Sequence, residues 1–303
     1  MNSLITSKAV FYRNVKDYKF SHKLNSEQKQ EIVIKLQQVL GDDYSLLNIS
    51  SLDSNVINYL NENSLINKTT TTILLNKNQP ICIDLFNGEH LSIVATGKDC
   101  FNNANKVADL IQNKINLSYS DDYGYLMSNL NYIGAGVKLE YDMCLDAICG
   151  INKLEQVKQN VAMLGYNLNP TNVKNCFKIS TKCSLGFSEA EIYDNFIKTI
   201  TKLHELEVES VKMLDVASHD EILDNVSRSL AILNAAYIIN VEELTRHIII
   251  LRTGLNLGVV DVEISKINKL QKLVINKLNY ATKEDCIKLA QQVKAILKGE
   301  NNV

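Results

Sequence analysis

Two short segments carry residues whose types and spacing can do chemistry, and the first is a turn. Asn87-Gly88 is a strong hairpin signal, and Glu89 and His90 follow it directly. Functional side chains often lie on such turns, where a neighbouring carboxylate and imidazole can move a proton. A histidine beside a turn is, however, more often structural or solvated, so both interpretations stay open.

The second segment is the run Gly134-Ala135-Gly136-Val137-Lys138. Its glycines can bring backbone amides, and its lysine an ammonium group, close to a phosphate. The spacing differs from a Walker motif, which has four residues between its glycines and then Lys and Ser or Thr. The alternative is a strand or turn whose glycines allow close packing.

Other kinds of site are not indicated. The chain has seven cysteines but no Cys-x-x-Cys pair, and most cysteines have apolar neighbours, which is typical of buried thiols. His204, His219 and His247 fall in predicted helices without partners at metal-ligand spacing. We therefore expect no metal site, no disulfide framework and no Ser-His-Asp triad.

Composition excludes several classes of protein. With 46% apolar and 22% charged residues, the chain is neither disordered nor fibrous. A net charge of −2 gives no electrostatic case for nucleic-acid binding. No apolar run has the length of a membrane span and the first residues do not resemble a signal peptide, so we expect a soluble, cytoplasmic protein. Only four of the 32 basic residues are arginine, namely Arg13, Arg228, Arg246 and Arg252. This bias is typical of an AT-rich genome.

Periodicity predicts the elements that must position these residues. Strand patterns occupy Thr70–Gly97, on both sides of the Asn87-Gly88 turn, and Phe177–Gly186. Helical patterns occupy four further segments of this part of the chain: Asn25–Leu40, Asn103–Ile115, Met143–Gly165 and a helix from Ser188 to Leu214.

After residue 216 no strand pattern remains. Four helices are predicted: Asp220–Ile239, Val241–Leu255, Val262–Leu278 and Thr282–Lys298. The change predicts two domains, a mixed α+β domain over residues 1–215 and an all-helical domain over residues 216–303.

Several segments, taken in order, resemble the guanidino-phosphotransferases, and most closely the bacterial protein-arginine kinases of the McsB type. They cover nearly the whole chain: Ser7–Asn14, Asn87–Ile93, Tyr123–Ser128, Ile133–Lys138, Phe177–Glu189 and Leu251–Gly258. The resemblance implies an antiparallel sheet flanked by helices, with ATP, Mg²⁺ and a guanidinium group meeting over the sheet. It also implies partners in the Clp protease and stress-repressor circuit, and a homodimer.

The chain departs from the family at the positions that do the chemistry. Family members hold the ATP phosphates with arginines, whose planar guanidinium groups bind phosphate oxygens in pairs. By resemblance, Lys8, Val10, Ser92 and Lys138 occupy arginine positions, Gly88 the catalytic glutamate and Asn129 the active-site cysteine. An Arg-Gly-x-x-Gly-Glu loop is missing near Asn169-Pro170, and Asp285-Cys286 replaces the Arg-Asp pair of the phosphoarginine-sensing motif.

These departures predict a catalytically impaired pseudokinase that keeps the fold. The alternative is an active, diverged kinase with Glu89 and His90 as catalytic residues and with Lys8 and Lys138 in the ATP site. A third hypothesis is a scaffold or adaptor that binds its partner through the helical domain.

Overall fold

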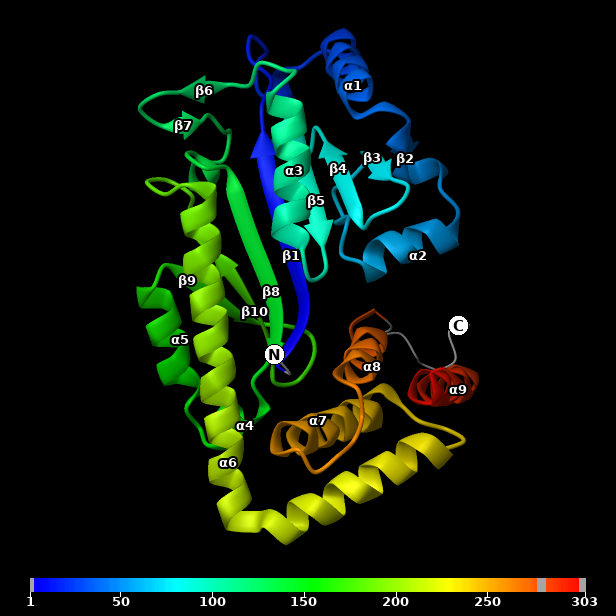
Figure 1. Cartoon of the computed structure of the whole chain (residues 1–303). Helices are drawn as coiled ribbons and strands as arrows, with labels where there is room; N and C mark the ends of the chain where they lie inside the picture. Colours follow the sequence, from blue (N-terminus) through cyan, green and yellow to red (C-terminus); the bar gives the residue numbers. More distant parts are fainter. Residues whose placement is uncertain (1–2, 277–281, 300–303) are drawn as a thin grey trace.

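The computed structural model describes residues 3–276 and 282–299, which form a mixed α+β fold. Its centre is an antiparallel eight-stranded sheet with the strand order β2-β3-β4-β5-β1-β8-β10-β9 (Figure 1). The strands are β1 (Leu4–Arg13), β2 (Tyr44–Asn48), β3 (Thr72–Asn76), β4 (Ile81–Leu85), β5 (Leu91–Thr96), β8 (Val137–Cys144), β9 (Tyr166–Pro170) and β10 (Cys176–Thr181). A two-stranded hairpin, β6 (Tyr119–Ser120) and β7 (Gly124–Tyr125), stands apart from it.

Helices cover the sheet unevenly. The described helices are α1 (Ser26–Leu40), α2 (Ser54–Glu62), α3 (Cys100–Gln112), α4 (Asp146–Gly150), α5 (Leu154–Met163), α6 (Glu189–Ala235), α7 (Val241–Leu257), α8 (Ile264–Asn276) and α9 (Lys283–Lys298). The main core joins one sheet face to α1, α3, α5 and the first part of α6. On the other face, α2 and the residues that follow it pack over β3, β4, β5 and Val10 of β1.

Most of the expected elements are confirmed. The helix predicted over Asn25–Leu40 is α1, and Asn25 caps it through a reciprocal pair of hydrogen bonds with Gln28. The Thr70–Gly97 segment forms β3, β4 and β5, with Gly88 in the positive-φ region of the β4–β5 turn. Leucine and isoleucine spacing therefore located these elements correctly.

Two predicted helices have the wrong limits. Met143–Gly165 is not one helix, because Met143 and Cys144 end β8 and a break at Asn152, which has a φ of +58°, separates α4 from α5. The break predicted after Leu214 is also wrong, because α6 continues from Glu189 to Ala235. Its first part packs on the sheet core and its second part on a separate core with α7, α8 and α9.

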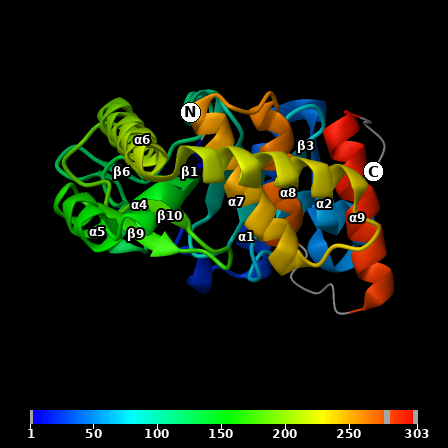
Figure 2. The same cartoon turned by 90° about the horizontal axis from the view of Figure 1, so that it is seen from below.

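The helical part of the chain packs against the end of the sheet where β1 begins. Figure 2 shows the second part of α6 running across α7 and α8 towards α9. Ile5, Cys144 and Cys176 from the sheet join the helical core, so the two parts share apolar contacts. The division at residue 215 remains a prediction, since α6 passes through it without interruption.

A cluster of buried charges lies at this junction. Glu207 of α6 accepts hydrogen bonds from the backbone N–H groups of Ala147 (2.8 Å) and Ile148 (3.0 Å), and so caps α4. Arg252 of α7 is 2% exposed and interacts electrostatically with both Glu207 and Asp146. Ionisable groups of three helices are thus buried close enough to one another to shift their pKa values.

The same cluster predicts a pH effect at Asp146. Burial, and then the like charge of Glu207, raises the pKa of Asp146 to about 7. Between its unfolded pKa of about 4 and this value, the folded state holds a proton that the unfolded chain has lost, so this contribution to stability falls as pH rises. We expect Asp146→Asn to raise the melting temperature at pH 8 and to reduce the gain seen on acidification to pH 5.5. Thermal unfolding at both pH values checks this, with the exposed Asp122→Asn as control. Equal pH profiles for the two variants would contradict it.

Candidate functional site

The candidate site lies on the sheet face that the main core does not use. Ala9 and Phe11 of β1 point into that core, so their neighbours Lys8 and Val10 lie on the opposite face. The pairing of β1 with β8 sets Lys8 opposite Glu140 and Val10 opposite Lys138. Lys8 and Lys138, the two expected phosphate-site residues, are therefore diagonal neighbours on one face.

Lys138 and Lys178 on this face each lie close to a carboxylate of β8. Lys138 Nζ lies 2.6 Å from Glu140 Oε1, and Lys178 Nζ lies 3.7 Å from Asp142 Oδ1. Burial lowers the pKa of Lys138, but Glu140 and Tyr132 more than offset this and the net pKa is raised. Burial raises the pKa of Glu140, yet the lysines around it bring the net pKa below its usual value. Both groups of the pair are therefore held in their charged forms.

Bulky side chains also occupy this face. The ring of Tyr12 stacks on that of Tyr132, with centroids 4.3 Å apart and an interplanar angle of 14°. Val10, at an arginine position of the resembling family, packs in an apolar cluster with Leu60 and Leu65. An arginine at residue 10 would meet apolar side chains in place of a phosphate.

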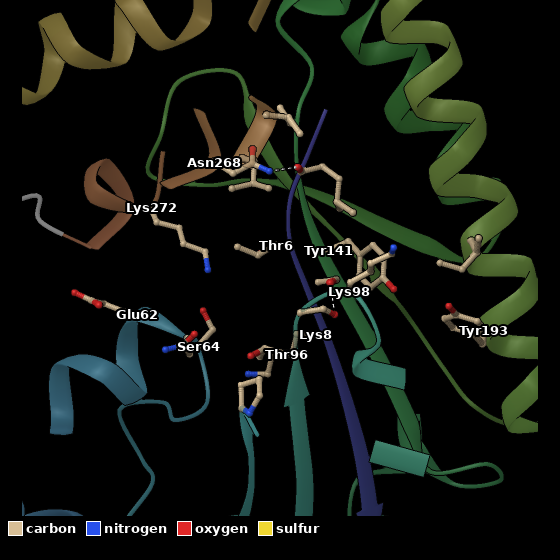
Figure 3. A pocket seen from close by; sticks show the side chains of 18 residues that line it. Thr6, Lys8, Glu62, Ser64, Thr96, Lys98, Tyr141, Tyr193, Asn268 and Lys272 are labelled. Atoms are coloured by element: carbon tan, nitrogen blue, oxygen red, sulfur yellow. Dashed lines mark hydrogen bonds between the residues drawn. The ribbon is translucent and has the colours of Figure 1, made fainter. Parts of the chain in front are cut away.

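A cavity of about 520 Å³ opens where β1 begins, and Lys8 contributes to its wall (Figure 3). Lys98 follows β5, Glu62 and Ser64 lie at the end of α2, and Lys272 comes from α8. Burial lowers the pKa of Lys8, and Glu140 opposes this effect. Sequence reasoning found Lys8 but missed the other lysines, since no local motif marks them.

Glu89 is 2% exposed and holds a loop in place. Its Oε2 accepts from Asn14 Nδ2 (2.6 Å) and the Ser128 amide (3.0 Å), and its Oε1 accepts from Ser128 Oγ (2.7 Å) and the Asn129 amide (3.0 Å). Four donors fill the acceptor positions of a carboxylate. This geometry leaves no lone pair for a substrate proton.

His90 is likewise buried and bonded at both ring nitrogens. The Val15 amide donates to Nδ1 (2.9 Å), so the proton lies on Nε2, which donates to the Lys19 carbonyl (2.7 Å). Burial lowers the pKa of His90, which keeps the ring neutral. Lys8 lies six residues before Asn14, the partner of Glu89, which corresponds to about 20 Å of extended strand, whereas Lys138 lies opposite Val10, only four residues before Asn14. The structure therefore places Glu89 and His90 far from Lys8 along β1, with Lys138 between them. Their catalytic role stays a prediction.

Arg13 was not expected to have a role, and the structure gives it one in packing. It is completely buried, and its Nη2 pairs with Glu189 at the start of α6. Its Cζ lies 3.7 Å from the ring centroid of Tyr125, and Nη1 donates to the Tyr12 carbonyl (2.8 Å). Gly136 permits this approach, because a Cβ there would lie 2.8 Å from Nη1. The glycine motif thus serves close packing at this position.

Two further properties concern the described residues alone. Within residues 3–276 and 282–299, no group of three or more His, Cys, Asp or Glu side chains has an arrangement that could hold a metal ion. None of the helices in these ranges combines the length and the apolar character needed to cross a membrane.

Similar proteins are found over most of the chain. A family profile described as ATP:guanido phosphotransferase, C-terminal catalytic domain, matches residues 7–210. A protein-arginine kinase of Clostridium perfringens is 28% identical over 290 residues, covering 88% of this chain and 85% of that protein. The protein-arginine kinase of Staphylococcus haemolyticus is 24% identical over 311 residues, covering 97% and 93%.

Solved structures show the same fold. A lombricine kinase has a TM-score of 0.58 at 15% identity, covering 68% of this chain and 66% of that chain. The duplicated taurocyamine kinase of Schistosoma mansoni has a TM-score of 0.59 at 13% identity, covering 68% of this chain and 33% of that chain.

Proposed function

Since the chain belongs to the ATP:guanido phosphotransferase family and is protein-arginine-kinase-like, we propose that it is a catalytically impaired member with a regulatory or scaffolding role. The main support for this proposal is that two lysines on the open face of the sheet lie close to carboxylates of the same face. There Lys138 and Lys178, which could bind phosphate, lie within 4 Å of Glu140 and Asp142. A phosphate group approaching this face meets two carboxylates as well as the lysines, which weakens its attraction.

The expected catalytic positions support the same proposal. Gly88 has no side chain to act as a base, and Ser92 has no positive charge. Loss of one positioned base or donor commonly lowers a rate by about 10²–10⁴. Glu89 lies next to the missing base, but its oxygens are used by four donors. Several such losses at one centre favour a protein that does not transfer phosphate.

The test is direct detection of phosphoarginine. We expect purified protein, incubated with Mg-ATP and an arginine-rich protein substrate, to give no phosphoarginine by mass spectrometry. A protein-arginine kinase handled in parallel is the positive control. Phosphoarginine that forms in proportion to the protein and is lost in Lys138→Ala would overturn the proposal.

An active but diverged kinase is the second candidate, and the cavity beside Lys8 favours it. Its size and its lysines fit a nucleotide, and Mg²⁺ bound with ATP would neutralise phosphate charge during transfer. This candidate uses Lys8, Lys138, Glu89 and His90. An active kinase requires both Mg-ATP binding and phosphoarginine formation. The impaired protein would form no phosphoarginine.

The partners are proposed from the same resemblance. We propose a cytoplasmic protein that acts in the Clp protease and stress-repressor circuit and forms a homodimer. The relatives named above are protein-arginine kinases, and the chain spans most of their length. Co-purification of the full chain with Clp and repressor proteins, together with sedimentation of the purified protein, tests these assignments.

A further inference from the structure

Two parts of the chain line the cavity beside Lys8, and only one of them lies within the residues that match the family profile. Lys8 and Lys98 lie within the matched residues 7–210, whereas α8 lies beyond them. Ile264, Asn268 and Lys272 line the cavity from α8, at intervals of four residues. Residues four apart share one side of a helix, so α8 presents a continuous stripe to this space.

The charges in the cavity are mostly positive. Its lining contains three lysines, Lys8, Lys98 and Lys272, and one carboxylate, Glu62. No hydrogen bond or ion pair joins these three ammonium groups to any residue that the structure describes. The Glu140 carboxylate, opposite Lys8, is already bonded to Lys138 at 2.6 Å. The cavity lysines therefore differ from Lys138 and Lys178, which are paired.

The remaining lining suits a ligand with both an anionic and a less polar part. Figure 3 shows Lys272 extending from α8 towards Ser64 on the opposite wall, with Thr6 and Thr96 nearby. The hydroxyl groups can donate to phosphate oxygens, and each lysine acts as a point charge. Tyr141, Tyr193 and Ile264 supply apolar surface on the other sides.

Helix α8 is held firmly enough to position its lysine. Asn268 Nδ2 donates to the Leu4 carbonyl of β1 (3.1 Å), and Arg252 Nη2 donates to Asn268 Oδ1 (3.2 Å). Ile267 and Leu270 of α8 are completely buried. Lys272 is thus one turn away from a residue that is bonded to both the sheet and α7.

We propose that Lys272 completes a phosphate-binding site with Lys8, so that a phosphate-bearing small molecule held there joins the helical part of the chain to the sheet. The proposal rests on the proposed function in one respect, namely that the ligand is held without being consumed. Binding of the ligand would then regulate how tightly the helical part is held to the sheet, because an occupied site strengthens the contact between α8 and β1.

The experiment uses the full chain and two probes, Mg-ATP and inorganic pyrophosphate, with calorimetric titration. Lys269→Ala is the matched control, since Lys269 is exposed on the same helix and does not line the cavity. We expect the wild type and Lys269→Ala to bind with equal affinity, and Lys272→Ala to bind about tenfold more weakly or worse. Lys272→Arg keeps the charge, and we expect it to bind within a few-fold of the wild type.

Amide hydrogen exchange gives the second readout. We expect either probe to slow exchange in α8 and at the start of β1 in the wild type, and to leave both unchanged in Lys272→Ala. Binding of both probes indicates recognition of the phosphates alone, and binding of Mg-ATP alone indicates that the apolar walls contribute. Absence of binding for both probes, or equal affinity of Lys272→Ala and Lys269→Ala, would overturn the proposal. Phosphoarginine formation would overturn the proposed function and leave this binding result intact.

Discussion

Arg252→Ala is expected to lower the free energy of unfolding by about 3–5 kcal/mol, because it removes the cation from a buried group of charges. Arg252 is 2% exposed and interacts with Asp146 and Glu207, which are themselves buried. Without it the Glu207 carboxylate and the Asp146 carboxyl group, whose pKa is already about 7, lose a nearby cation, and Asn268 loses a donor. Urea unfolding checks this, as a lower midpoint with an unchanged slope.

Arg228→Ala is the matched control for this substitution. Arg228 pairs with Asp224 on the exposed surface of α6, and such a pair contributes about 0.5 kcal/mol or less. An arginine is lost in both variants, so composition and net charge change equally. If Arg252→Ala were no more destabilising than Arg228→Ala, the buried charge cluster would not hold the junction together.

Glu89→Gln is the second substitution with a large expected effect, about 2–4 kcal/mol of lost stability. The amide keeps one acceptor oxygen but replaces the other with an NH₂ group. That group must face donors from Asn14 and Ser128, or from Ser128 and Asn129, which it cannot accept. Thermal and urea unfolding measure the effect, and Glu155→Gln on the exposed surface is the control.

This substitution also separates two roles for Glu89. A residue that serves only as a catalytic base would lose activity on conversion to glutamine and keep its stability. A residue that ties the 126–129 loop to the β4–β5 turn would lose stability first. Unchanged unfolding of Glu89→Gln, together with lost phosphoarginine formation, would return Glu89 to the catalytic role expected from the sequence.

Local patterns were sufficient for much of the fold. The turn at Gly88 and the cap at Asn25 are set by neighbouring residues, so they were predictable from sequence. The segment after Met143 was not, because its apolar residues serve a strand, a short helix and a second helix in turn. Periodicity alone does not distinguish these, since each buries residues at short intervals.

The candidate site was only partly predictable for a different reason. The resemblance identified Lys8 and Lys138, but the carboxylate beside Lys138 follows from the alternation of β8, and Lys272 lies more than 260 residues after Lys8. Contacts of this kind depend on the packing of α8 against β1, which no local motif encodes. Val10 gave no sign in the sequence that Leu60 and Leu65 would surround it.

The four arginines separate into two groups in the structure. Arg13 and Arg252 are among the largest fully buried side chains, whereas Arg228 and Arg246 are exposed. A genomic bias towards lysine can act freely on exposed positions. It cannot easily act on Arg13, which stacks on Tyr125 while bonding to carbonyls and to Glu189, because lysine lacks the planar group that does all three.

Helix α6 tolerates little change in the number of residues between its two packed parts. Phe196 and Leu203 belong to the sheet core and Val226 and Leu233 to the helical core, on one continuous helix. Deleting a single residue between them would turn everything that follows by about 100° and draw it back by about 1.5 Å. Val226 would then leave its core while the sheet stayed unchanged. The number of residues between the two cores therefore fixes the rotation of one core relative to the other. Insertions or deletions in the middle of α6 should be far less tolerated than in any surface loop.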